Sequence, residues 1–296
     1  MNITLTGANG FLAKTLIERL QKEGHQLHVL GRKPVEGLGF SNWDAMSGPP
    51  PEDSLKTADA IVHLAGEPVA QRWTPDVKRK IRDSRILGTR NLVHGLSTQS
   101  RRPRVLISGS ATGYYGSRGD EVLTEKSAPG DDFLAQVCVD WEKEAQMAES
   151  LGVRVVRLRT GVVLGKNGGA LQKILPPFRL GLGGRISSGK QWMPWIHIDD
   201  IAGLIKFAIK HEQTSGPLNG TAPKPATNTE FTETLAQALR RPAVFTVPAF
   251  ALKLAYGEMA SVVLGSQRAV PAGAQSAGYR FEFQELAVAL ADVVAR

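Results

Sequence analysis

Apolar and polar positions alternate in two distinct ways along the first half of the chain. Continuous apolar runs rich in β-branched residues predict buried strands, and apolar residues spaced three and four apart predict helices. The predicted strands are residues 3–7, 26–32, 58–66, 104–111 and 153–165, and the predicted helices are residues 11–24, 77–99 and 132–152. Because strands and helices alternate, the pattern predicts an α/β protein with a Rossmann-type doubly wound parallel sheet.

The pattern changes after residue 165. Residues 165–192 are rich in glycine, residues 195–210 return to a strand and a helix, and short elements separated by proline follow from residue 211. Asp199 or Asp200 is a plausible N-cap for that helix. We therefore predict a Rossmann domain over residues 1–165, to which 195–210 returns, and a smaller C-terminal α/β substrate lobe with a terminal module over 166–296.

The turn TGANGFLA, residues 6–13, lies between the first predicted strand and the first predicted helix. Its spacing, Gly-x-x-Gly-x-x-Ala, suits a tight turn, a close approach to a pyrophosphate and close packing of the helix on the sheet. The helix N-terminus would present free N–H groups to the phosphates. The residues of this turn expected to contact a dinucleotide are Gly7, Asn9, Gly10, Phe11 and Leu12.

The second predicted strand ends in Leu30-Gly31-Arg32-Lys33. A site selective for NAD would place an acidic residue here, to accept hydrogen bonds from the ribose 2′-hydroxyl. Arg32 and Lys33 cannot accept such bonds, but they can hold a 2′-phosphate. The sequence therefore predicts NADP as the cofactor.

Composition narrows the class of partner. The formal net charge is +8 and the pI is about 9.7, but the basic residues are scattered among acidic ones. An anionic cofactor or substrate fits this charge, and we expect no nucleic-acid partner. The single cysteine, Cys138, excludes an intrachain disulfide and a cysteine-based zinc cluster, so we expect no metal site.

Neither a signal peptide nor a membrane-spanning run is evident. The chain begins directly with a predicted strand, and no apolar run reaches the roughly 20 residues that cross a bilayer. We expect a soluble cytoplasmic protein that has no membrane partner and acts on a small molecule, with a homodimer as a possible assembly.

Several motifs in order resemble those of the extended short-chain dehydrogenases/reductases. More closely, the chain resembles their atypical "epimerase family protein" branch, which is nucleoside-diphosphate-sugar epimerase-like and ends in a short extra module. The matching segments span nearly the whole chain: TGANGFLA, HLAGEPVAQRW, SRILGT, GSATGYYG, DFLAQVCVDWE, RTGVVLGKNGGAL, WMPWIHIDDIAG, GPLNGTAPKPATNTEF and the run from VPAFALKLAYGEMA to GYRFEF.

The resemblance implies further cofactor contacts. Residues at the end of the third predicted strand would line the adenosine and pyrophosphate. One residue on the following helix would lie near the cofactor, and residues at the ends of the later strands would border the nicotinamide. In chain order, these residues are Leu64, Ala65, Gly66, Arg85, Ser108, Thr160, Gly161 and Val162. From local pattern alone, Leu64 and Ala65 would be core residues and Arg85 a surface residue.

The chain departs from the family at the catalytic Tyr-x-x-x-Lys pair. Counting back from Glu142, the Tyr position is Leu134 and the Lys position is Cys138. Neither side chain is suited to proton transfer, and Cys138 lies beside an apolar helix face, which favours a core cysteine over a catalytic thiol.

The family's active-site serine is retained as Ser110, and two tyrosines, Tyr114 and Tyr115, follow it in the same loop. In the family's mechanism a tyrosine phenolate takes the proton of a substrate hydroxyl while hydride passes to or from the nicotinamide. We therefore take Ser110, Tyr114 and Tyr115 as the candidate catalytic residues. The alternative for the tyrosines is an aromatic wall.

The substrate side is less determined. Met193 stands where the family has an arginine that clamps the diphosphate, and Val162 stands where it has a substrate-binding asparagine. Both differences argue against a sugar-nucleotide substrate. Glu67 is either a cleft base or a solvated loop residue, and His197 suits a structural hydrogen bond. The side chains that could still form an anion pocket are Arg179, Arg185, Lys190 and Trp192.

Three interpretations remain open from the sequence. The protein is an NADP-dependent oxidoreductase or epimerase with a non-standard acid/base set, or a non-catalytic NADP-binding redox sensor or scaffold. A third interpretation is an enzyme for a small apolar carbonyl substrate, where hydride transfer needs little general acid. The fold does not decide among them, because one scaffold hosts many functions.

Overall fold

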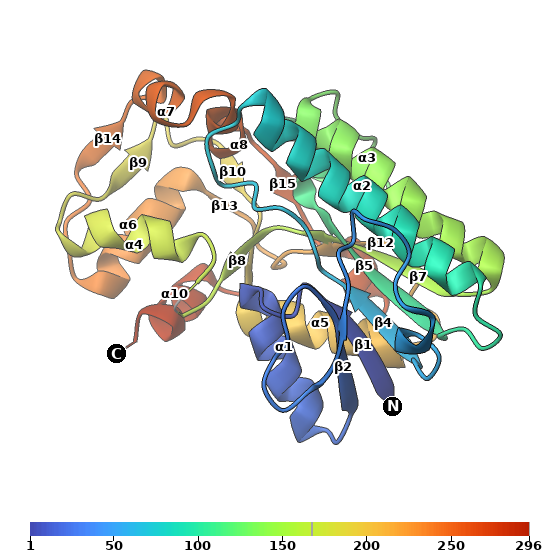
Figure 1. Cartoon of the computed structure of the whole chain (residues 1–296). Helices are drawn as coiled ribbons and strands as arrows, with labels where there is room; N and C mark the ends of the chain where they lie inside the picture. The colour runs from blue at the N-terminus through green and yellow to red at the C-terminus, as the bar shows by residue number, and fades with distance from the viewer. Residues whose placement is uncertain (167, 296) are drawn as a thin grey trace.

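A seven-stranded parallel sheet forms the centre of the computed structural model, which describes residues 1–166 and 168–295 (Figure 1). The strand order is β12-β7-β5-β4-β1-β2-β3. These strands are β1 (Asn2–Thr6), β2 (Gln26–Gly31), β3 (Gly39–Asn42), β4 (Ala60–His63), β5 (Val105–Ala111), β7 (Arg154–Thr160) and β12 (Gly216–Gly220). The order reverses between β1 and β4, and such a reversal is where doubly wound sheets bind ligands.

Helices cover both faces of this sheet. Helices α1 (Phe11–Lys22) and α5 (Ile198–Lys210) lie on one face, and α2 (Pro75–Ser97) and α3 (Phe133–Gln146) on the other. Successive side chains of a strand point to opposite faces, and Ile107 accordingly packs with the first pair while Leu106 packs with the second. Burial on both faces explains the continuous apolar strand runs, and the predicted Rossmann-type fold is confirmed.

A smaller lobe lies beside the main domain, at the left of Figure 1. Its core packs together side chains such as Leu171, Phe178, Trp195, Phe231 and Leu290. Its helices are α4 (Leu171–Arg179), α6 (Asn228–Leu239) and α10 (Leu286–Val294). Its paired short strands are β8 (Val162–Leu164) with β11 (Trp195–His197), β9 (Gly184–Ile186) with β14 (Phe245–Val247), and β10 (Trp192–Met193) with β13 (Ala226–Thr227).

The last fifty residues pass back and forth between the lobe and the main domain. After β14, helices α7 (Ala249–Tyr256) and α8 (Ala260–Leu264) lead to a contact of Met259 with Trp73 and Ile81. Strand β15 (Arg268–Ala269) then pairs with β6 (Val122–Leu123), and α9 (Ala272–Ser276) packs beside β12. Helix α10 finally returns to α6 in the lobe.

The predicted boundary at residue 165 therefore does not separate two consecutive pieces of chain. The segment 195–210 contributes α5 to the main domain, but its strand β11 pairs with β8 rather than with the large sheet. Residues 216–220 also return, as edge strand β12. Short 3₁₀ turns complete the description: η1 (Glu52–Ser54), η2 (Thr112–Tyr115), η3 (Met147–Leu151) and η4 (Gly257–Met259).

The N-cap prediction for α5 is wrong. The cap is His197, whose Nδ1 accepts a hydrogen bond from the Asp199 backbone N–H at 3.2 Å, and the two aspartates lie in the first turn. A carboxylate in the first turn still interacts favourably with the helix dipole. In the described ranges, no helix combines the length and apolar character that crossing a bilayer requires.

Candidate functional site

The turn after β1 lies against the end of β4. Gly7 has φ = +69°, and a Cβ there would lie 2.7 Å from the Leu64 carbonyl carbon and 2.8 Å from the Ala65 nitrogen. Real Cβ atoms do not approach backbone this closely, so only glycine fits both the conformation and the space. Gly7 thus brings the turn and two predicted cofactor residues, Leu64 and Ala65, into direct contact.

Helix α1 begins at this turn with its N-terminus free of side-chain capping. Its N-cap, Gly10, makes no side-chain cap hydrogen bond, and the first turn contains no acidic residue. The N–H groups of such an end favour an anion. Ala13 is buried and Leu12 packs against the core of the sheet, which matches the small and apolar positions of the motif.

Phe11 is covered by the glycine segment that opens the lobe. A Cβ at Gly165, Gly168 or Gly169 would lie within 3 Å of its ring. The glycines therefore let the lobe approach the first turn of α1. The sequence flagged this segment only by its glycine content, and its contact with Phe11 was not predicted.

The end of β2 carries the two basic residues predicted to select NADP. Arg32 and Lys33 are both exposed, and the Asn9 side chain donates a hydrogen bond to the Lys33 carbonyl at 3.2 Å. Asn9 therefore fixes the β2 end beside the glycine turn. The structure brings this part of the predicted set together at the carboxyl edge of the sheet.

Thr6 accepts hydrogen bonds from the backbone of both Leu64 and Ala65. The Thr6 carbonyl accepts the Leu64 N–H at 3.3 Å, and its hydroxyl accepts the Ala65 N–H at 3.2 Å. The same hydroxyl lies 2.7 Å from Nδ1 of His63, whose Nε2 lies 3.0 Å from the Thr89 hydroxyl. Burial lowers the pKa of His63 to about 4, so this imidazole is neutral at pH 7.

Arg85 reaches from α2 toward the exposed Gly66. Its Nη1 donates to the carbonyls of Glu67 at 2.9 Å and Ile81 at 3.1 Å, and its guanidinium lies 5.2 Å from the Trp141 ring. A Cβ at Gly66 would lie 3.1 Å from the guanidinium carbon, and burial lowers the Arg85 pKa. Arg85 is thus not a free surface residue but a support for the loop after β4.

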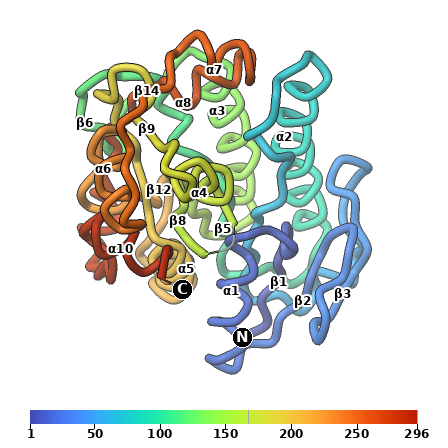
Figure 2. Tube along the Cα trace, turned by 90° about the vertical axis from the view of Figure 1, so that its left-hand side faces the viewer, coloured from blue at the N-terminus to red at the C-terminus, as the bar shows by residue number. Residues whose placement is uncertain are grey.

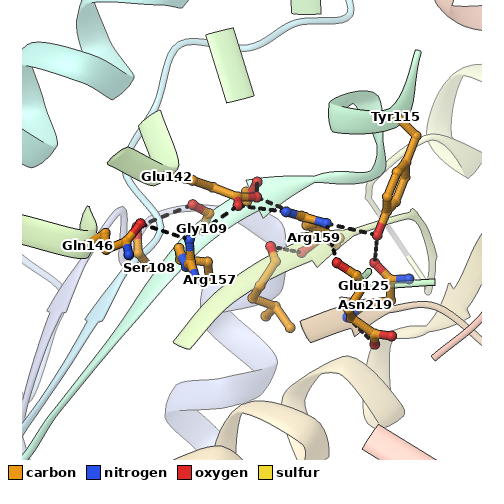
Figure 3. A network of polar contacts seen from close by, with 12 residues as sticks. Ser108, Gly109, Tyr115, Glu125, Glu142, Gln146, Arg157, Arg159 and Asn219 are labelled. Atoms are coloured by element: carbon orange, nitrogen blue, oxygen red, sulfur yellow. Dashed lines mark hydrogen bonds and ion pairs between the residues drawn. The ribbon is translucent and has the colours of Figure 1, made fainter. Parts of the chain in front are cut away.

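A buried ion pair lies under the candidate catalytic loop (Figure 3). Arg159 of β7 makes a bidentate contact with Glu142 of α3, with Nε–Oε1 and Nη2–Oε2 distances of 2.8 Å. Both side chains are less than 5% exposed, and the carboxylate raises the pKa of the guanidinium. Bidentate geometry of this kind is the strong form of charge-assisted hydrogen bonding.

Two of the three catalytic candidates belong to this network. The Ser110 hydroxyl donates to Glu142 at 2.7 Å. The Tyr115 hydroxyl donates to the Asn219 side-chain oxygen at 2.7 Å and accepts from Arg159 at 3.1 Å. Tyr115 is fully buried, and burial raises its pKa to about 12. Neither proton is free for exchange with a substrate in this arrangement.

Tyr114 is placed differently. Its half-buried ring lies under the Arg159 guanidinium, with 3.4 Å from the guanidinium carbon to the ring centroid, and edge-on to Tyr115. Among the residues that the structure describes, no side chain or backbone group bonds to its hydroxyl. It is therefore the candidate whose proton the fold leaves available.

The positions of the missing pair lie on α3. Leu134 is half-buried in an apolar cluster with Trp73, Phe133 and Val263. Cys138 is buried, and burial with the nearby Glu142 carboxylate raises its pKa to about 12. A thiol so protonated at pH 7 is not a nucleophile, which agrees with the predicted core cysteine.

The remaining predicted contacts are partly occupied by the protein itself. Ser108 is fully buried, and its hydroxyl donates to the Gly109 carbonyl at 3.2 Å. The Gly161 N–H donates to the Gly220 carbonyl at 3.0 Å, and the Val162 N–H to the Pro194 carbonyl at 2.6 Å. Thr160, half-exposed at the end of β7, keeps its hydroxyl near the Leu158 carbonyl at 3.4 Å.

The other polar and aromatic residues singled out from the sequence do not form one cluster. His197 is buried and stacks on Phe283 at 3.7 Å, as the structural interpretation expects. Trp192 donates to Asp120 at 2.8 Å, whereas Arg185 donates to Thr246 of β14. Glu67 accepts from Gln71 at 3.1 Å within its own loop.

Comparison with known proteins decides the family. A sequence model of the NAD dependent epimerase/dehydratase family matches residues 3–219, and one of a domain of unknown function (DUF1731) matches residues 247–293. The chain belongs to the NAD dependent epimerase/dehydratase family. Its resemblance to the epimerase family proteins is confirmed, as is the extra C-terminal module.

Relatives cover almost the entire chain. "Epimerase family protein YfhF" of Bacillus subtilis is 38% identical over 300 residues, covering 100% of this chain and 98% of that protein. The chloroplastic "Epimerase family protein SDR39U1 homolog" of Arabidopsis thaliana is 39% identical over 306 residues, covering 98% of this chain and 86% of that protein.

Solved structures agree with these relatives. Human epimerase family protein SDR39U1 (isoform 2), determined with NADPH, superposes with a TM-score of 0.91 at 35% identity and covers 99% of both chains. A nucleoside-diphosphate sugar epimerase from Corynebacterium glutamicum has a TM-score of 0.82 at 36% identity, covering 99% of this chain and 58% of that one. Together, these findings support a nicotinamide cofactor for this NAD(P)-binding family.

Proposed function

We propose that the protein is an NADP-dependent oxidoreductase of a carbonyl or hydroxyl substrate that works without the Tyr-x-x-x-Lys pair, using Tyr114 as its proton donor. The observation that carries the cofactor part is the turn at Gly7, where backbone fills the space that any larger residue would need. That cradle, the free N-terminus of α1 and the exposed pair Arg32 and Lys33 fit a dinucleotide bearing a 2′-phosphate. NADPH in the human relative adds support.

The chain's own residues have separable roles in this proposal. The Gly7–Gly10 turn binds the diphosphate, Arg32 and Lys33 hold the 2′-phosphate, and Arg85 stabilises the loop after β4. When bound, the nicotinamide supplies or accepts a hydride. Glu142 and Arg159 hold the hydroxyl groups of Ser110 and Tyr115 through hydrogen bonds. The Tyr114 hydroxyl is then the group that donates a proton to the substrate oxygen.

A second candidate function is supported by the same network. Because the protons of Ser110 and Tyr115 are held by protein groups and Cys138 is buried, the site resembles one that retained its cofactor and lost its chemistry. Such a protein would bind NADP as a redox sensor or scaffold, and only Tyr114 separates the two candidates.

In the first test, the purified protein is titrated with NADPH and with NADH, and binding is measured by nicotinamide fluorescence. Much tighter binding of NADPH is expected, and Arg32→Gln with Lys33→Gln should remove the preference. Equal affinity of the wild type for both cofactors would reject the 2′-phosphate assignment.

A panel of carbonyl compounds then tests turnover. Tyr114→Phe should lower kcat by about 10²–10⁴-fold, the range for one general acid, with NADPH affinity unchanged. Tyr115→Phe is the matched control, because the hydroxyl it removes lies in the buried network, so it should lower stability. NADPH binding with no turnover across the panel would favour the sensor.

A further inference from the structure

Two stretches of the C-terminal lobe contain basic residues and no acidic ones. Residues 168–190 carry four lysines or arginines, and residues 234–257 carry three. All of these side chains are exposed: Lys173, Arg179, Arg185, Lys190, Arg240, Arg241 and Lys253. The two stretches therefore bring positive charges and no negative charge of their own to this end of the lobe.

The two stretches lie side by side. Strand β9 pairs with β14 in parallel, with Gly184 opposite Phe245, and Arg185 Nε donates to the Thr246 hydroxyl at 3.3 Å. A Cβ at Gly181 would lie 3.7 Å from the Pro242 ring. Figures 1 and 2 both place β9, β14 and α7 together, away from the strands β1 and β2.

Large apolar side chains are exposed on the same two stretches. They are Leu180, Leu182, Val244, Phe245, Phe250 and Leu254, each at least 50% exposed. Helix α7 has no buried residue at all, and Lys253 is its only charged side chain. Helices normally bury one apolar stripe, so an apolar helix without a buried residue marks an interaction surface. The Lys173 ammonium donates to the Ala70 carbonyl of the main domain, so we call these apolar residues and the other six cations the basic-apolar face.

We propose that the basic-apolar face docks on the surface of an anionic lipid bilayer. Apolar side chains that project beside lysines and arginines insert at the boundary of headgroups and acyl chains, while the cations meet the lipid phosphates. This departs from our expectation of no membrane partner, which rested on the absence of a spanning run and does not bear on peripheral binding.

Two surface depressions lie beside the arginines of this face. One, of about 490 Å³, is lined in part by Arg240 and Arg241, and another, of about 180 Å³, is lined in part by Arg185 and Phe245. Glu233 of α6 lines both and is the one acidic side chain among their lining residues. The cations therefore outnumber the acid that faces them.

A second copy of the chain fits the face less well. A two-fold interface places the same surface on both subunits, so the cations of one copy would be brought beside those of the other. Like charges brought together in this way oppose association. Nucleic acid would satisfy the cations but would leave the exposed leucines and Val244 in water.

Co-sedimentation of the full chain with vesicles tests the proposal. One set contains equal parts of phosphatidylglycerol and phosphatidylcholine, and the other contains phosphatidylcholine alone. We expect binding to the anionic vesicles, and Arg240→Gln with Arg241→Gln should weaken it roughly thirty-fold. Phe250→Ser with Leu254→Ser should weaken it at least about tenfold.

Matched controls separate this face from general effects. Lys56→Gln with Lys143→Gln removes two exposed charges elsewhere, and Met147→Ser removes an apolar side chain that is 59% exposed. Both should bind as the wild type does, and NADPH titration verifies that every variant is folded. Absence of binding, or equal binding to both vesicle types, overturns the proposal. A dimer that Phe250→Ser with Leu254→Ser converts to a monomer, without vesicle binding, assigns the face to a second copy.

Discussion

At the scale of single residues, two different constraints act on glycines with positive φ. Gly7 and Gly24 have nearly the same conformation, with φ of +69° and +74°. A Cβ at Gly24 would meet no atom of the described residues within 4 Å, whereas one at Gly7 would meet the backbone of Leu64 and Ala65. Conformational strain and steric exclusion can therefore be separated in this protein.

Gly7→Ala is expected to lower both stability and cofactor affinity. A left-handed alanine costs about 1–2 kcal/mol, and the 2.7 Å approach to Leu64 adds to that cost. Gly24→Ala should show the conformational cost alone and leave NADPH binding unchanged. Urea unfolding and NADPH titration measure the two effects. Equal losses of stability for both variants would contradict the close approach.

His63 predicts a pH dependence of stability. Its pKa is about 4 in the folded protein and about 6.5 when unfolded, so the unfolded chain binds the proton more tightly. Stability is therefore complete above pH 6.5 and falls as pH drops toward 4, by about 3 kcal/mol from this group. His63→Asn should remove that part of the loss. Urea unfolding of both proteins at pH 4 and pH 7 measures it, because contributions of other groups cancel in the difference.

At the scale of elements, the sequence predicted the helices and strands that have a clear apolar pattern and missed the strands that lack one. The apolar runs of β1, β4, β5 and β7 and the glycine turn follow from local pattern, because buried parallel strands have no polar face. Strand β3 is largely exposed, and β12 reads GPLNG, which is a turn composition. Strands β3 and β12 pair because the sheet offers each of them an edge strand, and not because their own residues favour a strand.

The candidate site shows the same limit. Motif order predicted Ser110, Tyr114 and Tyr115 in one loop, whereas the structure has Ser110 in strand β5 and the two tyrosines in the 3₁₀ turn η2 that follows. The hydrogen-bond partners of Ser110 and Tyr115 lie 32 to 104 residues away in the chain, so no local pattern revealed that these two side chains are held in a buried network.

Helix α3 depends on its N-cap. The Asp132 carboxylate accepts the Ala135 N–H at 2.9 Å, and Asp131, the preceding residue, makes no cap contact. Asp132→Ala should lower the free energy of unfolding by about 1 kcal/mol, and Asp131→Ala should change it little. Denaturant titrations of the two variants decide between capping and a general effect of acidic charge near the helix start.

At the scale of the whole molecule, Asp200 connects helix α5 of the main domain to the C-terminal module. Its buried carboxylate accepts the N–H groups of Glu282 at 2.8 Å and Phe283 at 2.9 Å, and the Tyr279 hydroxyl donates to its carbonyl at 2.9 Å. Phe281 packs in the core of the main sheet, while Leu290 packs in the lobe. The C-terminal module is therefore shared by both cores.

Calorimetry should accordingly show one unfolding transition rather than two. Asp200→Ala leaves two buried N–H groups without partners and should lower stability by about 3 kcal/mol, shifting the whole transition. Asp199→Ala, which removes a half-exposed carboxylate that pairs with Arg19 and lies 3.7 Å from Nδ1 of His197, should cost about 1 kcal/mol or less. Separate transitions for the lobe and the main domain would contradict this coupling.

The path of the last fifty residues has a consequence for synthesis. A chain made from its N-terminus often completes an early domain while later residues are still being added. Here Ala274 and Phe281 belong to the core on one face of the main sheet, and Leu290 belongs to the core of the lobe. The core of the main sheet therefore stays incomplete until Phe281 has been made, and that of the lobe until Leu290 has been made, so the two cores close late and close together in synthesis.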